Sequence, residues 1–475
     1  MTRQRRVPAL AAIVLVVAGA LVVDSRVSRP TRRVEAGIQT PMGARASARS
    51  SAFFCTGSTS ADDGTANGTV VVANAGGRRL AGTVTVIPSE GDARQVDVSV
   101  PATGRAAVNL SEVVTAPYAS ALVELDGGQA AVELEVTGSL GNSVTPCASN
   151  ASTEWYFAEG ITTRDAVEVL TLFNPFPEDA VVDMLFTTEE GEVTPQALTG
   201  LSVRGRGMVA INVGEHVQRR EAVSAKITAR VGRLVTSRLQ TFDGSVGRKG
   251  VSVSLGAPAV GNVWYFPEGF LSDGLTERFQ LFNPGPEEAQ AQVELTLEQG
   301  GAEPIVLTVP AESRVTLTAN EEARIPKNVA HAATVRSTNG VGVVAERTVD
   351  GAAPYARTGL AIALGARVPA ERWVVAAGQV DEENDEWLVV QNPSSGQARV
   401  SVTLLDDGVR VTPTGLDNLE VPGRQRRAFR LSDSVRRGPT ALLISSSVPV
   451  VVERDVYKVG AAGMGMSVAI PLRPE

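Results

Sequence analysis

The sequence predicts an all-β fold, a tandem array of four Ig-like β-sandwich repeats behind one N-terminal transmembrane or signal helix. Three observations predict it. A motif recurs along the 475 residues, short runs alternate apolar and polar residues, and an uncharged apolar segment lies near the N-terminus. No long stretch after residue 50 has the 3.6-residue period of an amphipathic helix.

The N-terminal segment predicts export. Arg3, Arg5 and Arg6 precede an apolar run over residues 7–23, which is at the short limit for a membrane-spanning helix. The signal-peptidase pattern at residues 18–20 lies late in that run, so a retained anchor is favoured over a cleaved signal peptide. We therefore expect residues 1–23 to be a signal anchor or signal peptide. Residues 24–475 would lie on the extracytoplasmic face of a bacterial cytoplasmic membrane, or be secreted if the segment is cleaved.

Residues 24–50 differ from the rest of the chain. They are rich in arginine and small residues, which predicts a disordered basic linker.

The repeats begin with a six-residue motif. Trp155-Tyr-Phe-Ala-Glu159-Gly160 returns as Trp264-Tyr-Phe-Pro-Glu268-Gly269 and, weakened, as Trp373-Val-Val-Ala-Ala-Gly378. An asparagine-proline pair follows each glycine after fourteen residues: Asn174-Pro175, Asn283-Pro284 and Asn392-Pro393. A divergent first copy has Phe53 and Phe54 in place of the Trp-Tyr pair. We expect sandwich repeats over residues 51–149, 152–258, 262–366 and 370–475.

Within each repeat the residues four and two places before the asparagine are apolar, as on one face of a strand. In the third repeat Val293, Leu295 and Leu297 alternate with polar residues. Because the segments between repeats are short, we expect a semi-rigid rod, on the order of 100–160 Å long if extended. A β-propeller with two blades per repeat is the alternative, but it predicts similar half-repeats, and none is evident.

Cys55 and Cys147 are the two cysteines of the chain, and both stand in its exported part. An oxidising compartment favours a disulfide between them. Its reduction should destabilise the first repeat alone.

The Trp-Tyr-Phe-x-Glu-Gly motif, the Asn-Pro pair and a Val-Val-x-Glu-Arg strand resemble a repeat of exported actinobacterial proteins, domain of unknown function family 5719. The resemblance covers residues 51–475 and is weakest in the first repeat. It implies no activity. Relatives of this family are often encoded near membrane glycosyltransferases, so the resemblance implies a role in envelope polysaccharide assembly.

No residue pattern indicates catalysis, a cofactor or a metal site. The two histidines, His216 and His331, stand in different repeats, and P-loop, zinc-protease and serine-hydrolase motifs are missing. The acidic stretch at residues 381–386 lacks EF-hand spacing, so a solvated loop is preferred to a Ca²⁺ site. The net charge of −8 argues against nucleic acid as a partner.

The recurring residues have structural interpretations. We expect Trp155, Trp264 and Trp373 to pack in cores or between repeats in preference to stacking on sugars. The three asparagines should end strands through Asx turns. Glu159 and Glu268 should belong to structural turns, since one per repeat makes no glycosidase pair. For Arg238, Arg347 and Arg454 a buried pair with a carboxylate is preferred to a ligand clamp.

The hypothesis that follows is a non-enzymatic, membrane-anchored envelope protein that acts as a structural or interaction scaffold, with an envelope protein or polysaccharide as its partner. The alternative is a carbohydrate-binding accessory protein for polysaccharide assembly alongside a membrane glycosyltransferase.

Overall fold

A computed structural model describes residues 41–297 and 301–473. Residues 39–475 form one compact unit. Its described residues are organised into β-strands with five short 3-10 helices and no α-helix, as expected for an all-β protein. The expected anchor over residues 7–23 lies outside the described residues, among which no helix is long and apolar enough to cross a membrane.

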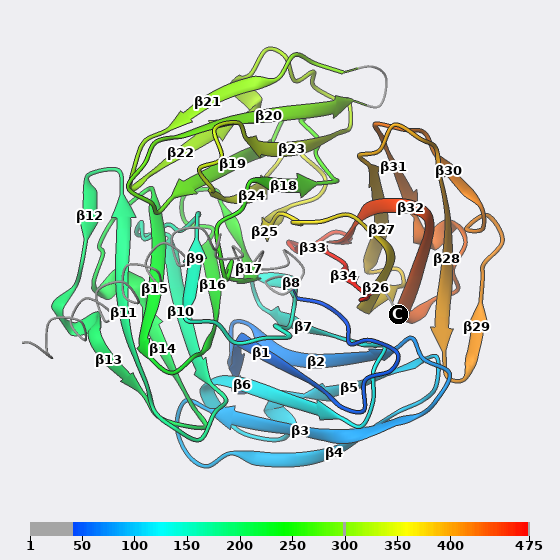
Figure 1. Ribbon diagram of the computed structural model, residues 1–475, viewed down its shortest axis with the longest axis horizontal. Helices are drawn as coiled ribbons and strands as arrows, with labels where there is room; N and C mark the ends of the chain where they lie inside the picture. Colours follow the sequence, from blue (N-terminus) through cyan, green and yellow to red (C-terminus); the bar gives the residue numbers. More distant parts are fainter. Residues whose placement is uncertain (1–40, 298–300, 474–475) are drawn as a thin grey trace, which may run out of the picture. The chain divides into compact units, whose positions relative to one another are not determined.

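The strands form four groups, named sandwich 1 to sandwich 4 (Figure 1). Sandwich 1 contains β1 (Ser51–Ser60), β2 (Asn67–Asn74), β3 (Leu80–Pro88), β4 (Arg94–Val100), β5 (Gly104–Asn109), β6 (Ala116–Leu125), β7 (Ala130–Gly138) and β8 (Gly141–Pro146). Sandwich 2 contains β9 (Glu154–Phe157), β10 (Ala166–Asn174), β11 (Ala180–Thr188), β12 (Gly191–Val193), β13 (Thr199–Val203), β14 (Gly207–Asn212), β15 (Val223–Val231), β16 (Val235–Asp243) and β17 (Lys249–Leu255).

Sandwich 3 contains β18 (Val263–Phe266), β19 (Leu275–Asn283), β20 (Ala289–Leu297), β21 (Ile305–Val309), β22 (Ser313–Thr318), β23 (His331–Ser337), β24 (Val344–Gly351) and β25 (Gly359–Leu364). Sandwich 4 contains β26 (Ala370–Val380), β27 (Asn384–Asn392), β28 (Ala398–Asp406), β29 (Val409–Val411), β30 (Leu419–Val421), β31 (Gln425–Arg430), β32 (Gly438–Lys458), β33 (Met464–Val468) and β34 (Ile470–Pro471). The 3-10 helices are η2 (Leu110–Glu112), η3 (Gln196–Leu198), η4 (Val213–Glu215), η5 (Ala319–Glu321) and η6 (Leu431–Asp433).

One strand order recurs in all four sandwiches. The inner sheets run β5-β2-β7-β8, β14-β10-β16-β17, β22-β19-β24-β25 and β31-β27-β32-β33. A second, outer sheet lies against each of them. In sandwich 1 the two sheets share β1, and in sandwich 4 the long strand β32 passes from one sheet into the other.

The four sandwiches form a closed ring, so the expected rod is wrong. Four strands, one from each sandwich, lie around the centre of Figure 1 and are named the central strands: β8, β17, β25 and β33. Here β8 contacts both β17 and β33, and β25 contacts the same two strands. Sandwich 4 returns to sandwich 1, since β26 packs against β2 and β7. Short linkers fix only the distance between neighbouring repeats. The bend at each junction, which closes the ring, depends on contacts between side chains.

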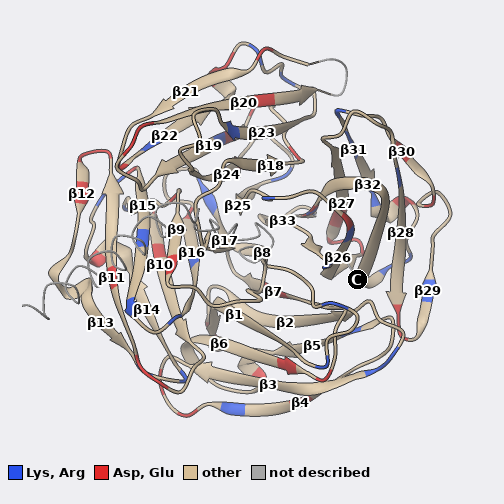
Figure 2. Cartoon of the chain, in the orientation of Figure 1, with Lys and Arg blue, Asp and Glu red and all other residues tan. Residues whose placement is uncertain are grey.

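The ring explains why the inner strands are more apolar than alternation requires. In β2 the residues Val70 and Val72 belong to the core of sandwich 1, whereas Val71 and Ala73 pack with Val374 of sandwich 4. A sheet buried on both faces reads as a continuous apolar run. The central strands have only one charged residue, Lys249 of β17, and Figure 2 draws them almost entirely in tan.

The segment before β1 packs against the end of the chain. The N–H of Gly43 donates to the carbonyl of Pro471 at 2.9 Å, and Gln129 of sandwich 1 donates to Ala44. Disorder, expected over residues 24–50, therefore does not extend to residues 43 and 44, and residues 1–40 lie outside the described residues.

Candidate functional site

The motif residues meet at the junctions between sandwiches. At the junction of sandwiches 2 and 3 (junction 2–3), Arg238 of β16 donates to both carboxylate oxygens of Glu346 of β24, each at 3.0 Å. Both side chains are fully buried. Arg238 also donates to the carbonyl of Glu159. The preferred interpretation, a buried pair with a carboxylate, is therefore correct for Arg238, and the partner comes from the next sandwich.

The six-residue motif forms the other half of this contact. One oxygen of Glu346 accepts the backbone N–H groups of Ala158 at 2.8 Å and Glu159 at 2.7 Å. The Glu159 side chain pairs with Arg314 of sandwich 3 at 2.9 Å. Buried charges are tolerated only when paired and hydrogen-bonded. Here both requirements are met by residues of two sandwiches, so Glu159 is more than a turn residue.

Junction 3–4 repeats this arrangement. Arg347 lies 2.6 Å from Glu453, whose other oxygen accepts the N–H of Glu268 at 3.1 Å. Glu268 in turn pairs with Arg426.

Junction 4–1, which closes the ring, uses the same chemistry. Glu133 of sandwich 1 accepts the N–H groups of Ala376 at 2.8 Å and Ala377 at 2.7 Å, and it lies 3.5 Å from Arg454. Ala377 replaces the motif glutamate, and Arg105 donates instead to the carbonyl of Gly378 at 3.1 Å.

The motif glycines face a further buried carboxylate eight residues along the chain. A Cβ atom at Gly160 would lie 2.6 Å from Glu168, and one at Gly378 would lie 2.6 Å from Glu386. Burial raises the pKa of Glu168 to about 8 and that of Glu386 to about 7. Neither oxygen of Glu168 has a hydrogen-bond partner among the described residues. A pKa of about 8 favours the protonated form of Glu168 at neutral pH, beside the ion pairs of Arg238 with Glu346 and of Arg314 with Glu159.

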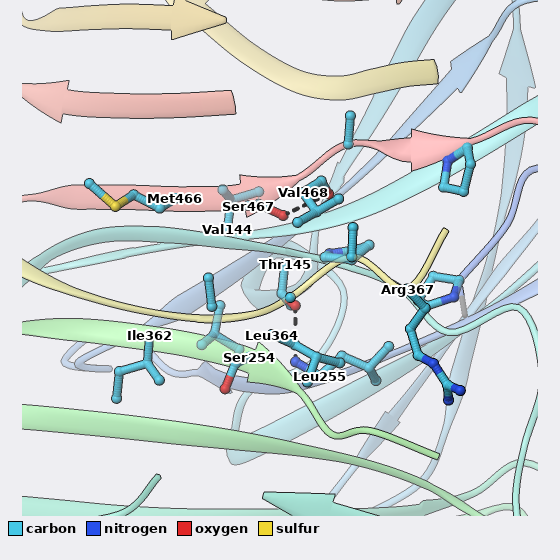
Figure 3. Close-up of a pocket in the computed structure, with 18 of the residues that line it drawn as sticks. Val144, Thr145, Ser254, Leu255, Ile362, Leu364, Arg367, Met466, Ser467 and Val468 are labelled. Carbon is cyan, nitrogen blue, oxygen red and sulfur yellow. Dashed lines mark hydrogen bonds between the residues drawn. The ribbon is translucent and has the colours of Figure 1, made fainter. Parts of the chain in front are cut away.

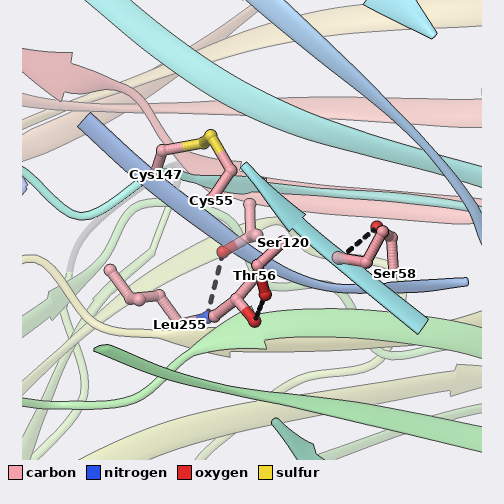
Figure 4. The surroundings of a disulfide bond; sticks show 8 residues. Cys55, Thr56, Ser58, Ser120, Cys147 and Leu255 are labelled. Atoms are coloured by element: carbon pink, nitrogen blue, oxygen red, sulfur yellow. Dashed lines mark hydrogen bonds between the residues drawn. A yellow bond between two sulfur atoms is a disulfide. The ribbon is translucent and has the colours of Figure 1, made fainter. Parts of the chain in front are cut away.

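Junction 1–2 lacks these charges. Strand register places Leu134 where the other sandwiches have Arg238, Arg347 and Arg454, opposite the residue four before the asparagine. Ser237 stands where the others have a glutamate. Hydroxyl groups replace the ion pairs, since Thr56 contacts Ser120 at 2.7 Å (Figure 4) and donates to Thr171 at 3.0 Å.

The predicted disulfide lies beside this neutral junction. Cys55, which directly precedes Thr56, is bonded to Cys147, and both residues are buried (Figure 4). The bond joins β1 to the segment that follows β8, so it ties together the two ends of sandwich 1.

The motif tryptophans are core residues. Trp155, Trp264 and Trp373 are at most 1% exposed, and each indole N–H donates to a backbone carbonyl of its own sandwich at 2.8–3.0 Å. They have no surface on which a sugar could stack.

The asparagines form the expected Asx turns. The side-chain oxygens of Asn174, Asn283 and Asn392 each accept the backbone N–H two residues on, at 3.1 Å. Each side-chain amide donates to a carbonyl four residues on in the same turn and to the carbonyl of the last residue of a neighbouring strand. Pro175, Pro284 and Pro393 follow them in these turns.

The remaining polar candidates are held by neighbours. His331 of β23 is buried, with its Nε2 atom 2.9 Å from Glu277. His216 caps η4. In the acidic loop, Asp381 accepts the N–H of Glu383, and Asp385 pairs with Arg357 and Arg430. Among the described residues no cluster of three or more His, Cys, Asp or Glu side chains is arranged to hold a metal ion.

The central strands enclose a small apolar cavity of about 50 Å³ (Figure 3). Figure 3 shows Val144, Leu255, Ile362 and Met466, one from each central strand, lining it. This volume holds only a few water molecules, and its lining is apolar. The cavity is a packing feature of the ring axis.

A larger cavity of about 260 Å³ lies at junction 3–4. Its wall combines aromatic side chains with charged ones, a mixture typical of ligand sites. The aromatic residues are Phe270, Tyr355, Trp387 and Tyr457, and the charged ones are Glu268, Arg347, Arg357, Arg426 and Asp455. Sequence reasoning missed this site because its aromatic residues are spread over two repeats and belong to no motif.

Comparison with known proteins identifies the family. The chain matches the model of a family of unknown function, DUF5719, over residues 126–313 and again over residues 257–465. The chain belongs to this family. The resemblance drawn from the motifs is thereby confirmed, and the DUF5719 description assigns no activity. No curated protein matches the chain.

Solved structures add little to the DUF5719 match. A protein titled Thermotoga maritima 1070 is 19% identical over 22% of this chain and 94% of its own, with a TM-score of 0.21. The Anabaena sensory rhodopsin transducer is 24% identical over 19% and 98%, with a TM-score of 0.16. A tetra-tandem repeat from the extending region of a large adhesion protein is 12% identical over 89% and 100%, with a TM-score of 0.11. At these scores no functional argument follows.

Proposed function

We propose that this protein is a non-enzymatic scaffold of the bacterial cell envelope, held on the extracytoplasmic face of the cytoplasmic membrane through residues 7–23. Its four sandwiches are diverged copies of one Ig-like repeat. The observation that carries the proposal is the set of buried ion pairs that join neighbouring sandwiches at three of the four junctions. Residues of the recurring motif contribute to these contacts, so the motif stabilises a rigid ring, as a scaffold requires. The disulfide in sandwich 1 is consistent with an oxidising compartment.

Membrane fractionation tests the location. We expect the native protein in the cytoplasmic-membrane fraction, accessible to protease added outside spheroplasts, with residues 7–23 retained in its intact mass. Recovery from the cytosol with both thiols free would contradict the proposal. Crosslinking of intact cells followed by purification should recover an envelope protein or polysaccharide as partner.

A carbohydrate-binding accessory role, alongside a membrane glycosyltransferase, is the second candidate. The aromatic cavity at junction 3–4 favours it, because aromatic faces and nearby polar groups together suit a ring with both C–H and hydroxyl surfaces. Binding of the full-length protein to an array of envelope glycans tests this role, and the absence of any bound glycan would exclude it.

A further inference from the structure

We propose that the cavity at junction 3–4 is a binding site for a single uncharged carbohydrate ring, with Trp387 and Tyr457 as its apolar wall and Asp455 as a hydrogen-bonding group. This inference rests on the second proposed function and adds the site and the ligand class.

The aromatic wall is specific to this junction. Trp387 stands five residues before Asn392, and Tyr457 stands three after Arg454. In sandwich 3 the same two positions hold Arg278 and Asp350, which form an ion pair at 2.7 Å. Packing at a junction therefore does not require aromatic residues here. Aromatics make up 4% of the chain, and Trp387 is the one tryptophan outside the repeat motif.

The charges of the cavity argue against an ionic ligand. The Arg357 guanidinium lies 4.0 Å from the ring centre of Tyr457 and 5.3 Å from that of Trp387, and it pairs with Asp385 at 2.8 Å. The protein thus already supplies a cation beside these two rings, and Asp385 neutralises its charge. Arg347 is paired with Glu453 and Arg426 with Glu268, so the cavity offers little excess positive charge to an anion.

Asp455 supplies a polar group inside the cavity. It is 1% exposed, and its Oδ1 atom has no hydrogen-bond partner among the described residues. Burial, together with Glu453 and Glu268, raises the pKa of Asp455 well above its usual range. The neutral carboxyl group can therefore both donate and accept a hydrogen bond, as a sugar hydroxyl requires.

The size of the cavity limits the ligand. Its volume of about 260 Å³ is below the range of about 300–1,000 Å³ for most small-molecule pockets. A single ring fits this volume better than an extended oligosaccharide, whose remaining units would lie outside.

The test titrates full-length protein with glucose, galactose, mannose, arabinose and rhamnose, and with glucuronate and glucosamine as charged comparators. Calorimetry measures affinity, and tryptophan fluorescence reports on Trp387 because the other three indoles are buried in cores. We expect at least one neutral sugar to bind saturably and to change the fluorescence. The double variant Trp387→Arg/Tyr457→Asp, which copies junction 2–3, should weaken binding at least tenfold, and Asp455→Asn should weaken it less.

The matched control is Arg278→Gln/Asp350→Asn in sandwich 3, which should leave affinity unchanged. Near-UV circular dichroism confirms that each variant is folded. Undiminished binding by the double cavity variant would show that the site lies elsewhere while the carbohydrate role stands. If glucuronate or glucosamine alone binds at the cavity, the uncharged class is wrong. If neither these sugars nor any array glycan binds, both this inference and the second proposed function are wrong.

Discussion

Junction 1–2 and junction 2–3 join neighbouring sandwiches of the same strand order, but by different chemistry. Junction 2–3 buries Arg238, Glu346, Glu159 and Arg314 as two ion pairs. Junction 1–2 has Leu134, Ser237, Thr56 and Met208 at the corresponding places. All four charged residues of junction 2–3 are thus replaced by uncharged residues at junction 1–2. Losing one member of a buried pair strands the other, whereas replacing both is tolerated, so the four positions are expected to change together.

The largest loss of stability is expected when one charge is removed from junction 2–3. Arg238→Leu leaves the fully buried Glu346 without its cation, so we expect the free energy of unfolding to fall by about 3–5 kcal/mol. Chemical denaturation measures the change. The double variant Arg238→Leu/Glu346→Ser, which copies Leu134 and Ser237, should lose much less than the sum of the single variants. Additive losses would show that the pair is not coupled.

The second prediction concerns the covalent link beside the neutral junction. The Cys55–Cys147 loop spans 92 positions, and Cys55→Ser/Cys147→Ser should cost about 2–4 kcal/mol, below the chain-entropy value of about 4.5 kcal/mol. The sequence alone led us to expect unfolding of the first repeat only. In a ring, sandwich 1 stabilises sandwich 4 as well, so we now expect one concerted transition at lower temperature by calorimetry. Separate melting of sandwich 1 would restore the local interpretation.

Glu133→Gln tests whether junction 4–1 resembles the internal junctions. The amide retains the size of the side chain but removes the charge that faces Arg454 and the two backbone N–H groups. We expect a loss of about 2–3 kcal/mol in unfolding free energy. The control is Glu135→Gln on the same strand. It also removes an acidic residue, but not one that accepts two backbone N–H groups of sandwich 4. In an open chain of repeats Glu133 would be a surface residue, and its replacement would have almost no effect.

The smallest effect is expected from Glu168→Gln, and its sign depends on pH. The folded protein raises the pKa of Glu168 from 4.5 to about 8. Above pH 4.5 the unfolded chain releases a proton that the folded chain retains, so stability falls as pH rises from about 4.5 to about 8. The variant should lack this decline and be about 1–2 kcal/mol more stable at pH 7. Melting curves across this pH range measure it, and parallel curves for both proteins would refute the assignment.

The sequence was sufficient for much of this architecture. Alternating apolar residues and the Asn-Pro turns predicted the strands, and two cysteines in an expected oxidising compartment predicted the bond between Cys55 and Cys147. The tryptophans and asparagines lie where local chemistry places them. The strands and turns depend on residues that are close in sequence. The disulfide could be predicted because the chain has only two cysteines.

Ring closure could not be derived from linker length, yet the residues contain a signal for it. Sandwich 1 keeps Glu133 and Arg105, at the two positions that face the preceding sandwich in sandwiches 3 and 4, although it is the first of the four described sandwiches along the chain. Sandwich 4 keeps Arg454, which faces a following one. The contact between sandwich 4 and sandwich 1 gives these charged groups their partners. The aromatic cavity has no comparable signal, because Trp387 and Tyr355 come from different sandwiches and no spacing links them.

Closure also has a consequence for the order in which the protein is completed. Val71, Ala73 and Ala131 of sandwich 1 are covered by Val374 and Ala376, which follow more than 240 residues later. During synthesis an apolar face of the first sandwich stays uncovered until the fourth sandwich has been made. Such exposed sheet surfaces promote aggregation, and distant contacts form slowly. The Cys55–Cys147 disulfide joins the two ends of sandwich 1, and it therefore stabilises this sandwich while the fourth is still missing.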